Sequence, residues 1–597
     1  MASSIIDELE HEALPGCSKL DVYYFFFQHD NQASVNATAA YRSILAQYFW
    51  KHRDDVAILD RFAFAIDDVG QGQQIASESA LLDLLSACLD EHSALVIDGV
   101  DECLDNDSLL KSLLRISNTA EPKILVLSRI NVAGLKRSVP LDAQISFSKG
   151  DVSRDIRRFC DRQLRELFLD EILSPAAEVQ QDNLLDCLVR GADGMFLWAR
   201  LMFNFLRSPC LTPMQRLRSI TEISFPEGLE KIYDRILSVI ALSGPYAERL
   251  AAKVLLWLAY SVSRLSSRQI RQGLIVDGCL EPEMAVEDVS EFESAAIMSC
   301  AGLVERFTVG SSLASLPFGA SSLRLCHLSV KEMVTKRFAN RPGILQSSIP
   351  GMAADMYRYP HPAVAHLHLA ELCLGQLLYH TEPCPLSGSP TKGISGSELH
   401  EKFCLTDYAA VAWLLHLDAN TLAAKSLGPS REWTAETRNS WSSFARTLEA
   451  FLENRLLVST WLESFYTATF PHVGRRQMHP RHEALKKWCS SAAPVLQTAE
   501  NPAESASLHV FTEFQRDLSY ILKVWGDRLR HSPTIIWDEM TVFANSRFFF
   551  SPGSTRLTFQ TPGKPKAGDL SDSSIAMISK VSSSGDMKGV LNVWPPR

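Results

Sequence analysis

Three short apolar runs, separated by helical stretches, constrain how the first 150 residues of this 597-residue chain can fold. Strands buried on both faces of a parallel sheet have such continuous apolar character, whereas half-solvated strands alternate. Strands that alternate with helices of this length predict a parallel α/β sheet within residues 1–150. The runs are VYYFFF (Val22 to Phe27), SALVIDGVDE (Ser93 to Glu102) and KILVLSRI (Lys123 to Ile130).

Helical periodicity dominates after about residue 150, where the strand signal fades. We predict a helix over SRDIRRFCDRQLREL with Ser153 as its N-cap. The segments GLVERFTVG and SLRLCHLSVKEMV predict a small β-wing followed by a helix. From about 534 the runs IIWDEMTVF, RFFF, RLTFQ and GVLNVW predict a β-rich segment, with a mobile stretch at 563–586. Five tryptophans are expected to anchor the helical core before it: Trp413, Trp441, Trp461, Trp488 and Trp525.

Composition and charge exclude several classes of protein. A formal charge of −10 and a pI near 5.9 argue against nucleic-acid binding. No apolar run reaches the roughly 18 residues that a membrane span needs, and the first residues do not form a targeting signal. Thirteen cysteines without a CxxC pair are typical of reduced thiols. We therefore expect a cytoplasmic protein that binds neither membranes nor nucleic acid.

Histidines and a cysteine cluster in HLHLAELCLGQLL and just before it, at His361, His366, His368 and Cys373. The Ala and Leu residues between them have the period of a buried helix. Tetrahedral metal sites usually have paired ligand spacings, which this run lacks. A packed helix is the preferred interpretation, and a metal site is the alternative.

The segment ALVIDGVDE carries the most chemical information in the sequence. Its apolar residues bury a strand, so Asp98 emerges at the carboxyl end, where open α/β sheets bind ligands. A carboxylate in that place can hold Mg²⁺ bound to nucleotide phosphates. Asp101 and Glu102 add carboxylates that could orient or deprotonate a water molecule. The alternative is a strand that ends in solvated acids.

A second strand, KILVLSRI, ends in Ser128 and Arg129 about twenty residues downstream. Adjacent strands that end in Asp98 and in this Ser-Arg pair would place a metal ligand beside groups able to contact a phosphate. The alternative is that Arg129 pairs with a surface acid.

The order of these blocks resembles the NACHT module of fungal incompatibility-type STAND proteins, NLR-like NTPases with a nephrocystin-3-like core. The similarity covers roughly residues 1–340 and rests on blocks such as ALVIDGVDEC, KILVLSR, GMFLWARLMFNFL, FPEGLEKIYDRIL and LCHLSVKEMV. The resemblance implies a truncated NTPase core that lacks Walker A at 1–150, a helical subdomain at 151–225 and a winged helix at 226–340. The patterns beyond it predict an α-helical region at 345–533 and a β-rich, partly flexible segment at 534–597.

The resemblance also implies roles for individual residues. Asp98 matches the Walker B acid that ligates the metal, and Asp101 and Glu102 match the catalytic acids after it. Ser128 and Arg129 match the sensor position. His327, in LCHLSV, matches a winged-helix histidine near the nucleotide, although a histidine packed in the wing is the preferred interpretation. ATP or GTP with Mg²⁺ is the cofactor that the family implies, and protein partners or a homo-oligomer are its implied assemblies.

The sequence departs from the family at the phosphate-binding loop. No G-x-x-x-x-G-K-[ST] run occurs in the 597 residues, and MASSIIDEL matches the interior of the helix that follows this loop in the family. We expect a chain truncated within that helix, either by a mis-assigned start or by loss of the gene's 5′ end. The strand before the loop is usually central in the sheet, so a weakened first domain is expected.

Two functions follow from these observations. The first is a NACHT-type STAND signalling protein whose nucleotide hydrolysis is impaired or absent. The second is a non-catalytic helical scaffold for protein–protein interaction. The retained IDGVDE and LSR segments favour the first, and the absent phosphate loop favours the second.

Overall fold

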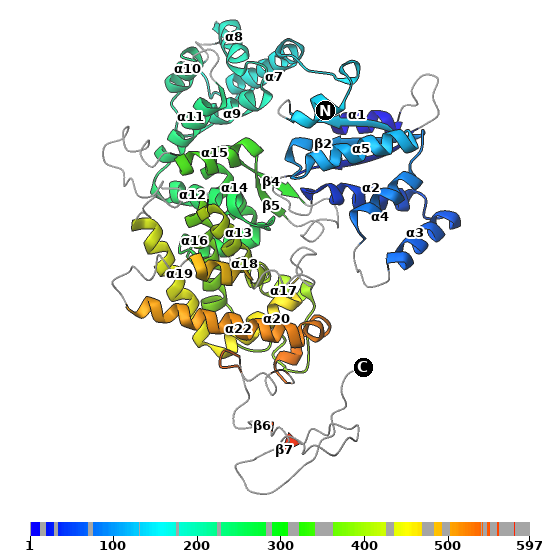
Figure 1. Cartoon of the computed structure of the whole chain (residues 1–597). Helices are drawn as coiled ribbons and strands as arrows, with labels where there is room; N and C mark the ends of the chain where they lie inside the picture. The colour runs from blue at the N-terminus through cyan, green and yellow to red at the C-terminus, as the bar shows by residue number, and fades with distance from the viewer. Residues whose placement is uncertain are drawn as a thin grey trace. The chain divides into compact units, whose positions relative to one another are not determined.

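A computed structural model of the chain contains two compact units, Met1–Ala199 with Ser219–Glu227 and Arg200–Arg218 with Gly228–Arg597 (Figure 1). It describes residues 2–11, 20–28, 34–69, 76–129, 132–174, 178, 180–223, 228–281, 289–308, 321–340, 362–425, 435–468, 483–491, 502–538, 540, 546–549, 558–559 and 578–579. The predicted layout of an α/β part followed by a mainly helical part is confirmed. The finer five-part division of the chain stays a prediction.

The first unit contains a three-stranded parallel sheet in the order β1-β2-β3. The strands are β1 (Asp21–Phe26), β2 (Ser93–Asp98) and β3 (Lys123–Leu127), which confirms the three apolar runs as strands. The central strand β2 is paired on both sides, and its first five residues are buried. Strands β1, β2 and β3 therefore form one continuous sheet.

Helices cover both faces of this sheet, because successive side chains of each strand point to opposite faces. Ala2 and Ile6 of α1 (Ala2–His11) pack with Val22, Ala94 and Val96 on one face. Residues on the other face, including Tyr23, Leu95 and Ile97, pack with α2 (Ala37–Lys51), α4 (Glu78–Cys88) and α5 (Asn106–Ala120). This alternation assigns Asp98 to the same face as Val96, which is the face covered by α1.

The remaining elements of the first unit are helical. They are α3 (Val56–Val69), η2 (Val100–Glu102), α6 (Ala133–Ser138), η3 (Leu141–Ala143), α7 (Lys149–Leu169) and α8 (Gln181–Ala192). Two further helices, α9 (Phe196–Leu206) and α10 (Pro213–Thr221), contribute residues to both units. The start predicted for α7 was wrong: Ser148, not Ser153, caps this helix, in a reciprocal capping box with Asp151.

Between Gly228 and Asn340, the described residues of the second unit form five helices and a two-stranded hairpin. The helices are α11 (Gly228–Leu242), α12 (Pro245–Tyr260), α13 (Ser267–Val276), α14 (Val289–Ser299) and α15 (Leu328–Asn340). The antiparallel strands β4 (Val304–Thr308) and β5 (Ser321–Leu325) precede α15, so the predicted pair of strands followed by a helix is confirmed. Their assignment to a winged helix stays a prediction.

Helices form most of the remaining described part of the second unit: α16 (Pro362–His380), α17 (Gly396–Lys402), α18 (Cys404–Lys425), α19 (Ala435–Glu453), α20 (Arg455–Thr467) and α22 (Pro502–His531) (Figure 1). Four of the predicted tryptophan anchors are fully buried and Trp525 is 7% exposed. The Trp413 and Trp461 rings lie 5.7 Å apart, and Trp441 stacks on Trp488 at 5.6 Å. The core prediction is confirmed.

The histidine-rich run forms the buried helix α16, as predicted, although His361 lies outside the described residues. His366 Nδ1 lies 3.0 Å from Nδ1 of His416 on α18, and His416 Nε2 lies 2.9 Å from the Tyr408 hydroxyl. His368 lies instead 3.4 Å from an oxygen of Asp277. Within the described ranges, no group of three or more His, Cys, Asp and Glu residues could hold a metal ion.

The carboxyl-terminal segment differs from the prediction in one described place. Where IIWDEMTVF was expected to begin a strand, the chain forms the 3₁₀ helix η7 (Pro533–Ile536). The Trp537 indole N–H donates to buried Glu463 (2.7 Å), which fixes this turn against α20. RFFF has no strand within its described residues, and RLTFQ contains β6 (Thr558–Phe559), which pairs with β7 (Ile578–Ser579). GVLNVW lies outside the described residues.

Candidate functional site

Asp98 ends the central strand, and its neighbours end beside it. The strand register places Asp98 opposite Phe26 of β1 and Leu127 of β3. The five residues before Asp98 in β2 are buried, whereas Asp98 itself is half-buried. The carboxyl ends of three parallel strands therefore meet at one edge, where α/β sheets bind ligands.

Gly99 turns the chain out of the sheet immediately after Asp98. Its φ of 74° lies in the left-handed region, which glycine adopts without steric penalty. Its N–H donates to the Leu127 carbonyl (3.1 Å), and a Cβ at this position would lie 3.2 Å from the Phe27 carbonyl oxygen. A glycine is therefore needed both for the backbone angle and for the close approach of β1. The turn leads directly into η2, which carries Asp101 and Glu102.

The carboxyl group of Asp98 lies in an environment that disfavours its charge. Burial is the main cause that raises the pKa of Asp98; a hydrogen bond from the Gly99 N–H and the positive charge of the amino terminus lower it, and the negative charges of Glu102 and Asp101 raise it again. No lysine, arginine or histidine of the described residues forms an ion pair with Asp98. A half-buried carboxylate in this setting would be stabilised by a bound cation.

Asp101 connects η2 to the end of β3. Its side chain is 7% exposed. Asp101 Oδ1 accepts the Arg129 backbone N–H at 3.2 Å and the Ser128 hydroxyl at 3.5 Å, and Oδ2 lies 3.2 Å from Arg129 Nε. The structure thus brings together Asp101, Ser128 and Arg129, three of the residues singled out in the sequence. The alternative prediction was that Arg129 pairs with an acid on the surface. The structure shows instead that Arg129 pairs with Asp101, whose side chain is buried.

Glu102 lies on the same 3₁₀ turn as Asp101 and is half-buried. Its backbone N–H donates to the Gly99 carbonyl at 2.7 Å, which closes the turn. Together with Asp98 and Asp101 it places three acids within five residues at one sheet edge, balanced in part by Arg129.

His327 belongs to the second unit and precedes α15. The Ser329 N–H donates to His327 Nδ1 (3.1 Å), and the Ser329 hydroxyl lies 2.7 Å from both His327 Nδ1 and the Tyr233 hydroxyl. Since Nδ1 accepts the backbone N–H, the ring proton of neutral His327 lies on Nε2. Its expected place near the other site residues stays a prediction.

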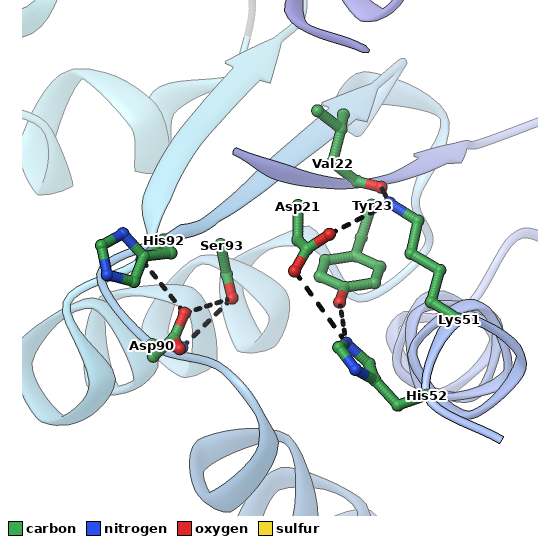
Figure 2. A network of polar contacts seen from close by, with 8 residues as sticks. All are labelled: Asp21, Val22, Tyr23, Lys51, His52, Asp90, His92 and Ser93. Carbon is green, nitrogen blue, oxygen red and sulfur yellow. Dashed lines mark hydrogen bonds and ion pairs between the residues drawn. The ribbon is translucent and has the colours of Figure 1, made fainter. Parts of the chain in front are cut away.

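A polar network at the opposite end of the sheet was missed in the sequence (Figure 2). Tyr23 donates or accepts a hydrogen bond with His52 Nε2 at 3.2 Å, and Lys51 and His52 lie 3.9 and 4.0 Å from Asp21. Asp90 accepts the Ser93 hydroxyl at 2.9 Å nearby. The signal available was an acid at the start of a strand and a Lys-His pair at the end of a helix. Because the network lies at the amino ends of the strands, it is more simply explained as a structural brace.

Comparison with known proteins gives one match to a protein family. The family model described as Nephrocystin 3, N-terminal, matches residues 1–129, which include all three strands and the segment from Asp98 to Arg129. No curated protein matches the chain. None of the described helices is long and apolar enough to cross a lipid bilayer. The match supports a loose relationship of residues 1–129 to the nephrocystin 3 amino-terminal region.

Proposed function

We propose that the first unit is a nucleotide-binding module of the NACHT type and that the chain is a STAND signalling protein with impaired or absent hydrolysis. One observation carries the proposal: a half-buried, raised-pKa Asp98 ends the central strand, next to an acid that holds Arg129. The match of residues 1–129 to the Nephrocystin 3, N-terminal, model supports the same class.

Asp98 is the residue that would hold Mg²⁺. The chemistry of the site fits this ion, because carboxylate oxygen is its preferred protein ligand and the Asp98 charge is not balanced by a cationic side chain among the described residues. A bound Mg²⁺ would supply positive charge for phosphate oxygens. Ser128 and Arg129 would contact those phosphates, and Asp101 and Glu102 would orient a water molecule. In this arrangement Asp101 would first have to release Arg129.

The helices α11 to α15 with the β4–β5 hairpin are proposed to form the winged helix of such a protein. His327 would serve it as a phosphate contact, since Nε2 of the neutral ring is a hydrogen-bond donor. A nucleotide-dependent change between two arrangements of the units would then drive oligomerisation with protein partners in the cytoplasm. ATP and GTP are both candidates.

Impaired hydrolysis is proposed from the sequence. The 597 residues contain no G-x-x-x-x-G-K-[ST] run, whose N–H groups and lysine would bind the β-phosphate. Each charge-assisted hydrogen bond lost contributes about 1.5–3 kcal/mol. The same absence favours the second candidate, a non-catalytic helical scaffold that binds other proteins whether or not a nucleotide is present.

Isothermal titration calorimetry on the full chain separates these candidates, with Mg²⁺ alone and with Mg²⁺ plus ADP, ATP or GTP. Asp98→Asn should weaken Mg²⁺-dependent binding at least about tenfold, the equivalent of one charge-assisted hydrogen bond. Asp21→Asn is the matched control, because it removes an acid from the opposite end of the same sheet. If the wild type and Asp98→Asn bind nucleotide with Mg²⁺ equally well, or if neither binds, the result would favour the non-catalytic scaffold. Mg²⁺-dependent turnover that Asp98→Ala abolishes would refute impaired hydrolysis.

A further inference from the structure

The outer edge of β1 is covered by side chains of α2. In a parallel strand, alternate residues direct their N–H and C=O groups toward the neighbouring strand or away from it. The N–H groups of Asp21 and Phe27 donate to β2-side carbonyls, those of His92 and Asp98. Val22 and Tyr24 lie between them in the alternation, so their backbone groups point away from the sheet.

Gln47 satisfies both outward groups of Tyr24. The Tyr24 N–H donates to Gln47 Oε1 at 3.0 Å, and Gln47 Nε2 donates to the Tyr24 carbonyl at 2.8 Å. A side-chain amide has the same donor and acceptor pair as a peptide group, so Gln47 occupies the place that the backbone of a further strand would take. Gln47 Nε2 also lies 3.3 Å from the Ser43 hydroxyl, which holds the amide in this orientation.

Lys51 extends this cover by one step along the strand. Its ammonium group donates to the Val22 carbonyl at 2.8 Å and lies over the Tyr23 ring, 4.8 Å from the centroid (Figure 2). Gln47 and Lys51 are four residues apart on a helix, about 6 Å along its axis. Val22 and Tyr24 are two residues apart on a strand, about 6.6 Å. The near-equality of these spacings lets one face of α2 follow the edge of β1.

We propose that Gln47 and Lys51 form an edge guard that prevents the outer edge of β1 from pairing with the same edge of a second copy of this chain. Exposed strand edges are templates for pairing with another chain, and inward-reaching charged or polar groups are a known way to block them. This inference is independent of nucleotide binding.

The second copy is the occupant that the geometry favours. The N–H and C=O of Tyr24 both point outward, so two antiparallel β1 edges related by a two-fold axis could place Tyr24 opposite Tyr24 and exchange both hydrogen bonds. The Tyr24 side chain is 38% exposed and its ring lies 5.8 Å from that of Phe26, so the pairing would also bury aromatic surface.

The test compares Gln47→Met with Ala46→Met in the full chain. Methionine is close to glutamine in length and helix propensity but forms neither hydrogen bond to Tyr24. Ala46→Met adds the same side chain one residue away, at an exposed position of α2. Site-resolved hydrogen exchange reports the Tyr24 amide, and sedimentation velocity over a concentration series reports association.

For Gln47→Met at low concentration we expect the Tyr24 amide to exchange about tenfold faster than in the wild type. At high concentration a dimer should form and the protection of this amide should return. Ala46→Met should match the wild type in both measurements. Unchanged exchange at Tyr24, or sedimentation identical to that of Ala46→Met at every concentration, would refute the edge guard.

Gln47→Glu keeps the test decisive if the methionine variant loses helical content by circular dichroism. An ionised glutamate can accept the Tyr24 N–H but cannot donate to its carbonyl, so it should leave the amide protected and add repulsion between two copies. A monomer with a protected Tyr24 amide supports the proposal. A Gln47→Glu dimer, or a loss of protection in the monomer, contradicts it.

Discussion

Two clusters of polar residues differ in the charge that their surroundings favour. One lies at the edge of the sheet and the other lies inside the helical unit. At the sheet edge, Asp98 and Asp101 are carboxylates, and Arg129 lies 3.2 Å from the latter. In the helical unit, His366, His416 and Tyr408 form a hydrogen-bonded chain in which burial lowers the pKa of both imidazoles and raises that of the phenol. The first cluster contains acidic side chains and an arginine, with Asp98 half-buried, whereas the second is neutral and buried.

The difference shows why residue type alone does not identify a site. The sequence predicts a packed helix for the histidine-rich run, with a metal site as the alternative, and a Mg²⁺ ligand among the acids of the sheet. The surroundings of the buried histidines are the Tyr260 ring, 5.4 Å from His366, the thiol of Cys373 facing Tyr408, and Lys331, whose charge lowers the pKa of His366 further. None of these groups stabilises an imidazolium, so the histidine pair contributes to the fold as long as it remains neutral.

The largest effect expected from this comparison is acid destabilisation of the helical unit. Burial lowers the pKa of His366 to about 4, against an ordinary value of 6.5. The unfolded chain binds more protons than the folded chain between these values, so stability falls as the pH drops from about 6.5 to 4. At about 1.36 kcal/mol per pKa unit, His366 alone accounts for about 3 kcal/mol. Urea unfolding followed by the fluorescence of the buried tryptophans at pH 7, 5.5 and 4 measures this loss.

A matched pair of variants shows whether the histidine pair causes that loss. His366→Phe with His416→Phe should flatten the dependence of unfolding free energy on pH, since neither phenylalanine can bind a proton. His509→Gln serves as the control, because the His509 side chain is 76% exposed and should leave the slope unchanged. An equally steep slope in the double phenylalanine variant would mean that other groups cause the acid sensitivity.

A smaller effect is expected at the charged group of the sheet edge. Asp101→Ala removes a buried acceptor of three contacts and leaves Arg129 without this acid, which should destabilise the first unit by about 2 kcal/mol. Asp83→Ala breaks the Arg115–Asp83 pair, whose side chains are 57% and 65% exposed, and should change stability by less than about 1 kcal/mol. Hydrogen exchange across Lys123–Leu127 gives the local readout. An equal loss of stability in the two variants would mean that Asp101 does not stabilise the contact between η2 and β3.

The sequence was sufficient to predict the sheet, because the three strands are continuous apolar runs and their burial needs no partner beyond adjacent helices. It also placed Asp98, Asp101, Ser128 and Arg129 at one edge, since parallel strands end together. The Asp101–Arg129 pair depends on the turn at Gly99 and on the strand register. Local sequence periodicity predicts neither of these. The expected β-segment at IIWDEMTVF was wrong in its described part because Glu463, about seventy residues earlier, binds Trp537 and favours a 3₁₀ turn.

Helix ends were less predictable than helix centres for a similar reason. Ser153 and Ser148 both stand near the start of α7, and local preference does not separate them. Ser148 caps the helix because Asp151 lies three residues after it, and the two exchange hydrogen bonds. Gln47 was missed altogether: on α2 it resembles any helical glutamine, and only the packing of α2 against β1 shows its two contacts with Tyr24.

The smallest change in stability is expected at Asp98. It tests whether the Asp98 carboxylate serves to bind a ligand or to stabilise the fold. The folded-state pKa of Asp98 is raised, mainly by burial, so its contribution to stability is present at low pH and is lost as the pH rises through the folded-state pKa. Asp98→Asn should therefore stabilise the chain by about 0.5–1 kcal/mol at pH 7 without divalent cations, and less at low pH. Thermal unfolding at pH 7 and pH 4 measures the change.

Measuring the stability of Asp98→Asn with added Mg²⁺ separates two roles of Asp98, cation binding and stabilisation of the fold. A cation bound at Asp98 would stabilise the wild type and not Asp98→Asn, so the advantage of the variant should shrink or reverse as the Mg²⁺ concentration rises. The double phenylalanine variant of the histidine pair should respond to Mg²⁺ as the wild type does, because its substitutions lie in the buried, neutral cluster. If Asp98→Asn is less stable than the wild type even without Mg²⁺, the carboxylate is held by the fold itself, and its position at the end of β2 no longer indicates a cation site.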